Sequence, residues 1–474
     1  MRLPALGVKG WPSLLVAGLL FGCAAFEPRP IEPAKVEAEF RGRTLSDPGL
    51  RTYIEANRPA RRETLPPGTL DLADLTLIAF YYHPALDVAR TRVGVAAAGI
   101  VTAGGRPNPR IALAPEYDAD VLAGVSPWIL GFSLQIPVET AGKRGYRIAR
   151  AEHLTEAARL DLAEVAWRVQ SRVRATLAEH LFARQELGLL DAEERIRSEF
   201  ATAMEKRLAV GDVSRPDVDT SRAELARARL AARSAATRVA ERLAALATAL
   251  GMPVSALDGA SFAWAELTRV PGDNALSAPA LQRAGLVNRA DVRRALAEYA
   301  AAETLLRLEI ARQYPDVQIG PGYKWDQGED KFSLGFSVTV PAFNRNEGPI
   351  AEAEAQRREL SARFLALQSG VIGEIDRALV RYRGVLSEVT EAEAALREFE
   401  ERERATARAL ELGEADRLSL LGVQLQRALT ARGRLESLGK ARAALGALED
   451  AVQRPLDGNA VAPDVGPASP RAGR

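Results

Sequence analysis

The 474-residue sequence has very few of the side chains that usually carry chemistry: one cysteine, three histidines and three methionines. A single cysteine excludes an intrachain disulfide framework. His83, His153 and His180 contain no pair at i, i+4 spacing, so a Cys-His metal cluster is not available. No phosphate loop or nucleophile elbow stands out. We therefore expect no metal site, no cofactor and no catalytic residue, and predict that the protein is not an enzyme.

An excess of charge of one sign is also absent. The 63 basic and 62 acidic residues are interspersed, so nucleic-acid binding has no electrostatic basis. Aromatic residues make up only 6%, and Ala, Arg, Glu and Leu dominate, which is typical of long helices. No proline occurs in 143–207 or in 350–453. A helix of about 65 residues would be roughly 97 Å long, which no compact domain requires.

The first 22 residues differ from the rest of the chain in their pattern of charge. A basic start precedes the uncharged stretch 10–22, a pattern typical of a secretory signal and too short to span a membrane comfortably. The stretch ends at Leu-Phe-Gly-Cys, which resembles a bacterial lipobox, so we predict lipidation of Cys23. Phe21 is bulkier than the usual residue there, and the alternative is an ordinary signal peptide with an incidental cysteine. Ala24 in place of aspartate favours sorting to the outer membrane.

One unit occurs twice in the chain. In each copy two short alternating stretches end at a proline, and long helical patterns flank them. Tyr117 and Tyr323 are 206 positions apart, and Pro137 and Pro341 are 204 apart. We predict strands at about 109–118, 127–137, 315–325 and 331–341, and hence a mostly α-helical fold with a small β part in two tandem helix–β-hairpin–helix repeats.

Apolar residues in 332–340 alternate with small or hydroxylated ones, and 128–136 alternates similarly. Strand geometry puts the two sets on opposite faces. An apolar face opposite a small, uncharged face indicates lipid on one side and a water-filled lumen on the other. The alternative is an ordinary sheet packed on the helices. Four aromatic residues lie toward the loop ends, where interfacial aromatics belong: Tyr117, Trp128, Tyr323 and Trp325.

Four strands cannot close a membrane barrel. Open sheet edges are not tolerated in lipid, and closed barrels begin at about eight strands. Several chains must therefore contribute to one barrel, and three chains would supply twelve strands.

Each long helix is expected to end in a glycine turn, at Gly211 and at Gly413. Helices returning from these turns should extend to about Leu250 and Val452, and shorter helices are expected at about 84–106 and 288–313. The chain then divides as follows: 1–22 signal peptide, 23–69 lipidated and extended N-terminal tail, 70–275 first repeat, 276–453 second repeat, 454–474 disordered C-terminal tail.

Short motifs in both repeats resemble the TolC-like outer-membrane efflux proteins. They are Asp71–Leu75 running into Tyr82–Leu86, Pro137 with Gly142–Arg144, and Pro341 with Asn344–Ala353. The resemblance covers about residues 70–453, and the last of these motifs is the most specific. It implies a homotrimer with a twelve-stranded barrel in the outer membrane, continued by a tunnel of helices across the periplasm.

The resemblance implies a passive exit duct of a tripartite efflux system. Its partners would be an inner-membrane resistance-nodulation-division pump and a periplasmic adaptor (membrane fusion) protein. The stretch 344–353 looks most like members that serve heavy-metal pumps, which favours heavy-metal cations as the substrate. Multidrug efflux, a type I secretion exit duct and a periplasmic coiled-coil adaptor or scaffold lipoprotein are the alternatives.

The resemblance also suggests roles for individual residues. Gly211 and Gly413 would lie at hairpin tips where the adaptor docks, although both are turn glycines in any case. Four prolines would mark the strand–helix junctions: Pro109, Pro137, Pro315 and Pro341.

A gate is expected close to the tips, where family members commonly place acidic rings or salt bridges. Asp217 falls at such a position in the first repeat, whereas Ser419 and Gly422 stand there in the second. Asp416 and Arg417 could form substitute pairs with the aspartates of the first tip. The candidate gate residues are Asp212, Asp217, Asp219, Asp416 and Arg417. Solvated charges next to a turn are the alternative.

Overall fold

The computed structural model of the chain describes residues 26–58, 69–122, 124–264, 267–272 and 276–456. It divides into two compact units, residues 1–43 and 44–474. The described part of the first unit contains one helix, α2 (Pro33–Arg41), in which Arg41 pairs with Glu37 at 2.6 Å. Cys23 lies outside the described residues, as do the signal segment 1–22 and residues 457–474.

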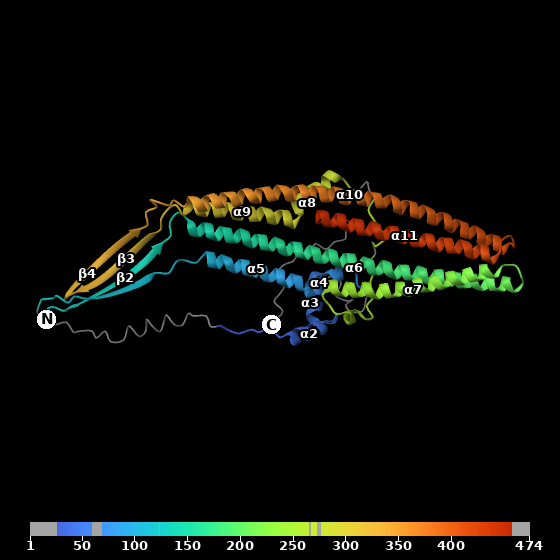
Figure 1. Cartoon of the computed structure of the whole chain (residues 1–474), viewed down its shortest axis with the longest axis horizontal. Coiled ribbons are helices and arrows are strands. Elements are labelled where there is room, and N and C mark those ends of the chain that lie inside the picture. Colours follow the sequence, from blue (N-terminus) through green and yellow to red (C-terminus); the bar gives the residue numbers. More distant parts are fainter. Residues whose placement is uncertain (1–25, 59–68, 123, 265–266, 273–275, 457–474) are drawn as a thin grey trace. The chain divides into compact units, whose positions relative to one another are not determined.

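The second unit is mostly helical and contains one small antiparallel sheet (Figure 1). This confirms the predicted fold class at the level of secondary structure. Its longest helices are α6 (Lys143–Ala209) and α10 (Glu347–Glu411), of 67 and 65 residues. The returning helices α7 (Arg215–Leu250) and α11 (Arg417–Val452) end where the sequence predicted. The other elements are α3 (Pro48–Asn57), α4 (Leu72–Tyr82), α5 (Pro84–Ala103), β1 (Arg110–Tyr117), β2 (Trp128–Val138), η2 (Val254–Leu257), α8 (Ala278–Asn288), α9 (Ala290–Ala311), β3 (Val317–Asp326) and β4 (Glu329–Val338).

Local chemistry explains where the helices begin and end. Pro84 stands in the first turn of α5, where its missing N–H costs nothing, and the His83 side chain accepts a hydrogen bond from the Ala85 amide. Helix α7 begins with a capping box in which Ser214 and Asp217 bind each other's backbone amides. It ends at Gly251, whose φ of +72° is the left-handed conformation that glycine adopts easily.

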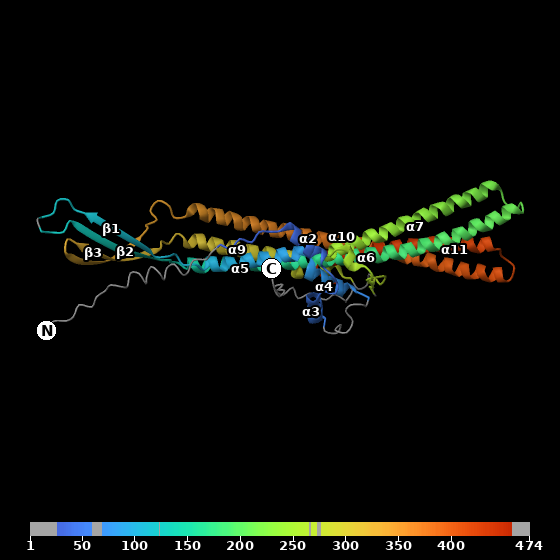
Figure 2. The ribbon, with the colours of Figure 1, turned by 90° about the horizontal axis from the view of Figure 1, so that it is seen from below.

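The helices pack in the order α5, α6, α9, α10, each against the next, in the half of the unit next to the strands (Figure 1). In the other half α6 pairs with α7, and α10 pairs with α11. Figure 2 shows these two pairs as hairpins that diverge toward their tips, and α11 also packs against α6. One core joins α3, α4, α6, α7 and the segment after α7, and a second joins α8, α10 and α11. Each repeat therefore has its own apolar core.

Both hairpins join one sheet in the order β1-β2-β3-β4, with all neighbours antiparallel. The β3–β4 connection has two residues, Gln327 at φ +53° and Gly328 at φ +110°. Positive φ at both positions suits the right-handed twist of a tight hairpin. The β1–β2 connection, residues 118–127, is much longer. Strands β1 and β4 are the free edges of the sheet.

Two predictions about local structure differ from the structure. Strand β4 begins at Glu329 and ends at Val338, earlier than the predicted 331–341, because the two-residue turn lets pairing start at once. The expected extended tail at 23–69 contains α2 and α3. Helix α3 has Asp47 as its N-cap and buries Leu50 and Ile54 at i, i+4 spacing, so an amphipathic helix signal was present there.

Candidate functional site

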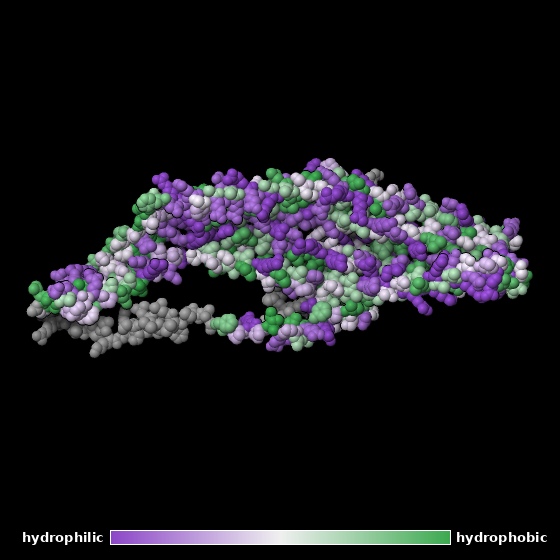
Figure 3. Space-filling view, viewed as in Figure 1, coloured by the Kyte–Doolittle hydropathy of each residue, from purple (hydrophilic) through white to green (hydrophobic). Residues whose placement is uncertain are grey.

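One face of the sheet is apolar across all four strands. The register puts Leu113 opposite Phe132, Phe132 opposite Tyr323, and Tyr323 opposite Phe332, so the apolar rows of both repeats coincide. These side chains are not covered within the chain: Leu113 is 74% exposed and Phe332 83% exposed. An apolar patch of this extent is a surface for lipid or for another protein. By contrast, the helices expose mostly hydrophilic side chains in Figure 3, with scattered hydrophobic ones.

Aromatic residues gather at the loop end of this face. Tyr117 and Trp128 are directly opposite in the ladder, and their rings meet edge to face with centroids 5.1 Å apart. Tyr323 pairs with Phe332, with ring centroids 5.4 Å apart. This arrangement suits a boundary between hydrocarbon and water.

The opposite face of the sheet is mostly small, with Gly131, Ser133 and Gly322 near its centre. The sequence pattern predicted that this face is uncharged, and that prediction is wrong. Glu116 and Lys324 form an ion pair of 3.4 Å close to the loop end. Charges at the loop end are compatible with water on this side of the sheet.

The strand–helix junctions are stiffened by polar contacts. Pro109 and Pro315 lie just before β1 and β3, Pro137 is the penultimate residue of β2, and Pro341 follows β4 by three residues. In the junction between the repeats, Lys143 Nζ donates to Asp316 Oδ1 at 2.7 Å. These contacts lower the pKa of the Asp316 carboxyl, where the hydrogen bonds from Lys143 and Thr140 outweigh the opposing effect of burial.

Gly211 and Gly413 occupy the turns at the hairpin tips, as predicted. Their φ values are +83° and +76°, a conformation that a residue with a Cβ adopts only at a cost. The Asp212 amide donates to the Arg207 carbonyl at 2.9 Å, and the Glu414 amide donates to the Ala409 carbonyl at 2.8 Å. The two tips are therefore built alike.

The charged residues of the tips have other partners than those we predicted. Asp416 pairs with Arg207 at 2.5 Å, and Arg417 pairs with Glu199 at 2.5 Å. The substitute pairs between Arg417 and the aspartates of the first tip are therefore not formed in the described chain. Residues 199 and 207 are on α6, so both pairs join the second hairpin to the first. Asp219 pairs with Arg215 on its own helix at 3.2 Å.

Capping sets the charge state of two tip carboxylates. The Ser419 hydroxyl and amide and the Arg207 guanidinium lower the pKa of Asp416 to about 2. Asp217 is exposed, and its pKa is also lowered because the Ser214 hydroxyl and amide donate to it. Both side chains therefore remain anionic over the whole physiological range, and both act as helix caps.

A polar seam between the repeats was missed by sequence reasoning. Arg174 of α6 donates to Glu449 at 2.6 Å and to Asp450 at 2.7 Å. Ser171 donates to Asp450 at 2.6 Å, and the Trp167 indole donates to Asp450 at 3.0 Å. Glu449 is only 2% exposed. The sequence signal was a pair of acidic residues inside the apolar end of α11.

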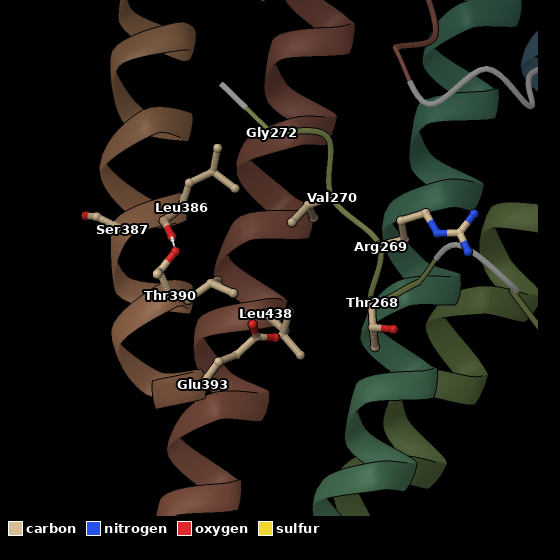
Figure 4. A pocket seen from close by; sticks show the side chains of 10 residues that line it. Thr268, Arg269, Val270, Gly272, Leu386, Ser387, Thr390, Glu393 and Leu438 are labelled. Atoms are coloured by element: carbon tan, nitrogen blue, oxygen red, sulfur yellow. Dashed lines mark hydrogen bonds between the residues drawn. The ribbon is translucent and has the colours of Figure 1, made fainter. Parts of the chain in front are cut away.

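A shallow cleft lies between the segment Thr268–Gly272 and helices α10 and α11 (Figure 4). Two of its polar side chains bind neighbouring groups: the Thr390 hydroxyl donates to the Leu386 carbonyl at 3.0 Å, and Glu393 accepts from Arg434 at 3.0 Å. Arg269 points away from Glu393 in this view. The cleft is a packing gap beside the connection between repeats.

Within the described residues, no three side chains of histidine, cysteine, aspartate or glutamate lie close enough together to hold a metal ion. None of the helices in that part of the chain is both long and apolar enough to cross a membrane.

Comparison with known proteins connects this geometry to a family. Residues 80–252 match the family described as outer membrane efflux protein. The cobalt-zinc-cadmium resistance protein CzcC of Cupriavidus metallidurans is 30% identical over 239 residues, which cover 49% of this chain and 55% of that protein. The nickel-cobalt-cadmium resistance protein NccC of Alcaligenes xylosoxydans xylosoxydans is 28% identical over 343 residues, covering 70% and 74%. The chain thus spans only about half the length of the first of these relatives.

Solved structures share the fold. The outer membrane protein VceC of Vibrio cholerae superposes with a TM-score of 0.63 at 19% identity, covering 81% of this chain and 96% of VceC. CusC, described as undergoing transmembrane channel formation, gives 0.63 at 15% identity, covering 82% and 95%. The fold is therefore that of the TolC-like outer-membrane channels.

Residues 80–252 thus match the outer membrane efflux protein family, and the relatives and the fold agree with that match. The predicted resemblance is confirmed, and so is the predicted location in the bacterial outer membrane with a periplasmic extension. Members of this family are channel proteins rather than enzymes.

Proposed function

We propose that the protein is the exit duct of a tripartite efflux system that expels heavy-metal cations. The main support for this proposal is the similarity to CzcC and NccC, whose names assign them to cobalt, zinc, nickel and cadmium resistance. The chain also has the fold of the outer-membrane channels. An inner-membrane resistance-nodulation-division pump supplies the energy, and a periplasmic adaptor joins it to this protein. The duct itself conducts passively, because a tight cation site would slow passage.

The functional unit of this proposal is a homotrimer with a twelve-stranded barrel. The sheet of one chain has two free edges, and free edges must be paired in lipid. Its exposed apolar face supports contact with lipid, and its smaller polar face then lines the lumen. Detergent extraction followed by native mass determination tests this. A heat-sensitive trimer is expected, and a stable monomer would contradict it.

The adaptor docks at the hairpin tips in this scheme. Gly211 and Gly413 are at the far end of the long helices from the sheet, and both residues are exposed. Replacing each glycine by tryptophan is expected to reduce cross-linking between this protein and its adaptor. Unchanged cross-linking would refute the role of the tips.

The charged tip residues Asp212, Asp217, Asp219, Asp416 and Arg417 form the proposed gate region. The pairs from Arg207 to Asp416 and from Arg417 to Glu199 support it, because they tie the two hairpins together. Neutralising Asp416 and Arg417 should raise the open probability of single channels. An unchanged open probability would leave these residues with a structural role only.

Lipidation of Cys23 anchors the N-terminus in the membrane in this proposal. Incorporation of labelled fatty acid by the wild-type protein, and its loss in Cys23→Ser, is the expected result.

Disruption of the gene in its own host tests the function. The disrupted strain is expected to accumulate cobalt, zinc and cadmium and to grow less well on them, and the intact gene should restore growth. Loss of drug resistance with unchanged metal tolerance would indicate multidrug efflux. Loss of a secreted protein would indicate a type I secretion duct, and a soluble periplasmic monomer would indicate an adaptor or scaffold.

A further inference from the structure

The contact between the repeats at the strand–helix junction is unusually complete. Lys143 is buried, and its Nζ donates to Asp316 Oδ1 at 2.7 Å and to the Tyr314 carbonyl at 2.6 Å. The Thr140 amide donates to Asp316 Oδ1 at 2.9 Å, and its hydroxyl donates to the Pro315 carbonyl at 2.7 Å. The start of α6 is thereby fixed to the connection between α9 and β3.

The internal repeat assigns a counterpart to each side of this contact. Lys143 is the first residue of α6 and Glu347 is the first residue of α10, and each follows a residue with positive φ, Gly142 or Asn346. The two positions are 204 apart, the same spacing as Pro137 and Pro341.

The other side of the contact repeats as well. Asp316 directly follows Pro315, and Arg110 directly follows Pro109, 206 positions earlier. The counterpart of the Lys143–Asp316 pair is therefore Glu347 with Arg110. The basic residue of the first pair corresponds to an acidic residue in the second, and the acidic residue corresponds to a basic one. The two members of the second pair therefore still attract each other.

Glu347 and Arg110 cannot meet within one chain. Arg110 begins the edge strand β1, and Glu347 follows the edge strand β4, so the whole sheet lies between them. Both residues are exposed, and neither side chain has an ion pair within the described part of the chain. Two complementary charges are thus left at opposite edges of the same wall.

We propose that Glu347 of one copy binds Arg110 of the neighbouring copy, and that this charge-exchanged junction selects the β4–β1 pairing in the assembled wall. The proposal rests on the homo-oligomeric channel of the previous subsection and names the contact that closes it. The partner is a second copy of this chain, recognised by charge complementarity beside the ladder of the two edge strands.

The register of the sheet agrees with this pairing. Ile136 pairs with Ile319 and Phe132 pairs with Tyr323 in the ladder between β2 and β3. Strand β4 repeats β2 at a spacing of 204 residues, and β3 repeats β1 at a spacing of 206. Applied to the two edge strands, the same register pairs Val340 with Leu113, and Phe336 with Tyr117, of the next copy. All four of these residues belong to the apolar rows, and a shift by one residue would put apolar side chains opposite polar ones.

Charge exchange in the full-length protein tests the contact. Glu347→Arg alone or Arg110→Glu alone places like charges together at every interface and is expected to raise the concentration at half-dissociation by about tenfold. The double variant restores the attraction and should restore wild-type assembly. The matched control is Glu401→Arg, which reverses an exposed charge 54 residues further along α10, roughly 80 Å away.

Cysteine cross-linking supplies a second readout. Arg110→Cys combined with Glu347→Cys should give a ladder of disulfide-linked oligomers on oxidation, whereas either single variant should not. An intact oligomer that does not cross-link and is indifferent to charge reversal would overturn this contact while leaving the proposed channel standing. A wild-type protein that remains monomeric would overturn both.

Discussion

At the scale of single residues, Arg174 is the side chain that most directly connects the two repeats. It binds two carboxylates of α11 from the middle of α6, and one of them, on Glu449, is almost fully buried. Removing one member of a buried charged pair costs far more than breaking an exposed pair, because the remaining charge has lost its compensation. Loss of Arg174 should therefore lower the stability of the protein by a measurable amount.

We expect Arg174→Met to destabilise the protein by about 3 kcal/mol. Arg168→Ala is the matched control on the same helix: the Arg168 side chain is 63% exposed, and its pair with Glu164 should contribute less than about 1 kcal/mol. Thermal unfolding followed by helical circular dichroism compares them. Adding Glu449→Gln to Arg174→Met should recover part of the lost stability. Equal losses of stability in Arg174→Met and Arg168→Ala would refute the buried pair.

Asp416 makes the second tip sensitive to acid. Its pKa is about 2 in the folded chain against an ordinary value of 3.8, so its contribution is complete above pH 4 and is lost as the pH falls toward 2. Asp416→Asn should therefore increase pepsin cleavage near residue 413 at pH 4, and the difference from wild type should disappear near pH 2. Asp219→Asn serves as the control, and a ratio that does not change with pH would count against the cap.

At the scale of elements, the glycines that end helices are not equivalent. A Cβ at Gly251 would lie 2.9 Å from the Tyr82 carbonyl oxygen, whereas a Cβ at Gly413 would meet no atom within 4 Å. Gly413→Ala should cost only the left-handed backbone, about 1–2 kcal/mol. Gly251→Ala should cost clearly more because the joint between α4 and α5 must move. Thermal unfolding of both variants tests this order, and equal losses would contradict it.

Helix positions could be predicted from the sequence because they depend on local signals. Proline-free runs, Gly211 and Gly413 fix the hairpins with no knowledge of packing. Side-chain partners could not be predicted, since Arg417 finds Glu199 only after two helices from different repeats lie together, 218 residues apart in sequence. The seam at Arg174 was missed for the same reason. Helix α3 was missed although its cap and its apolar spacing were visible.

At the scale of the whole molecule, the proposed barrel puts the apolar face of the sheet against lipid. Phe336 lies on this face and is 68% exposed, while its neighbour Ser337 points to the opposite face. Phe336→Lys should cost about 2–4 kcal/mol in a bilayer and reduce the amount of protein in the outer-membrane fraction. Ser337→Lys should leave that amount nearly unchanged. Equal losses would mean that the face does not meet lipid.

The two β-hairpins differ in their connections, and this difference decides where the loop end of the sheet can tolerate changes of sequence. The Gln327–Gly328 turn admits almost no change, because both of its residues need positive φ. The connection 118–127 is less constrained: of its residues that the structure describes, only Gly124 has positive φ, at +93°. The other described residues can accept an inserted epitope without disturbing either strand. In the proposed orientation they face the cell's surroundings, where antibodies and bacteriophages bind. Sequence variation under immune or phage selection is therefore expected to concentrate there.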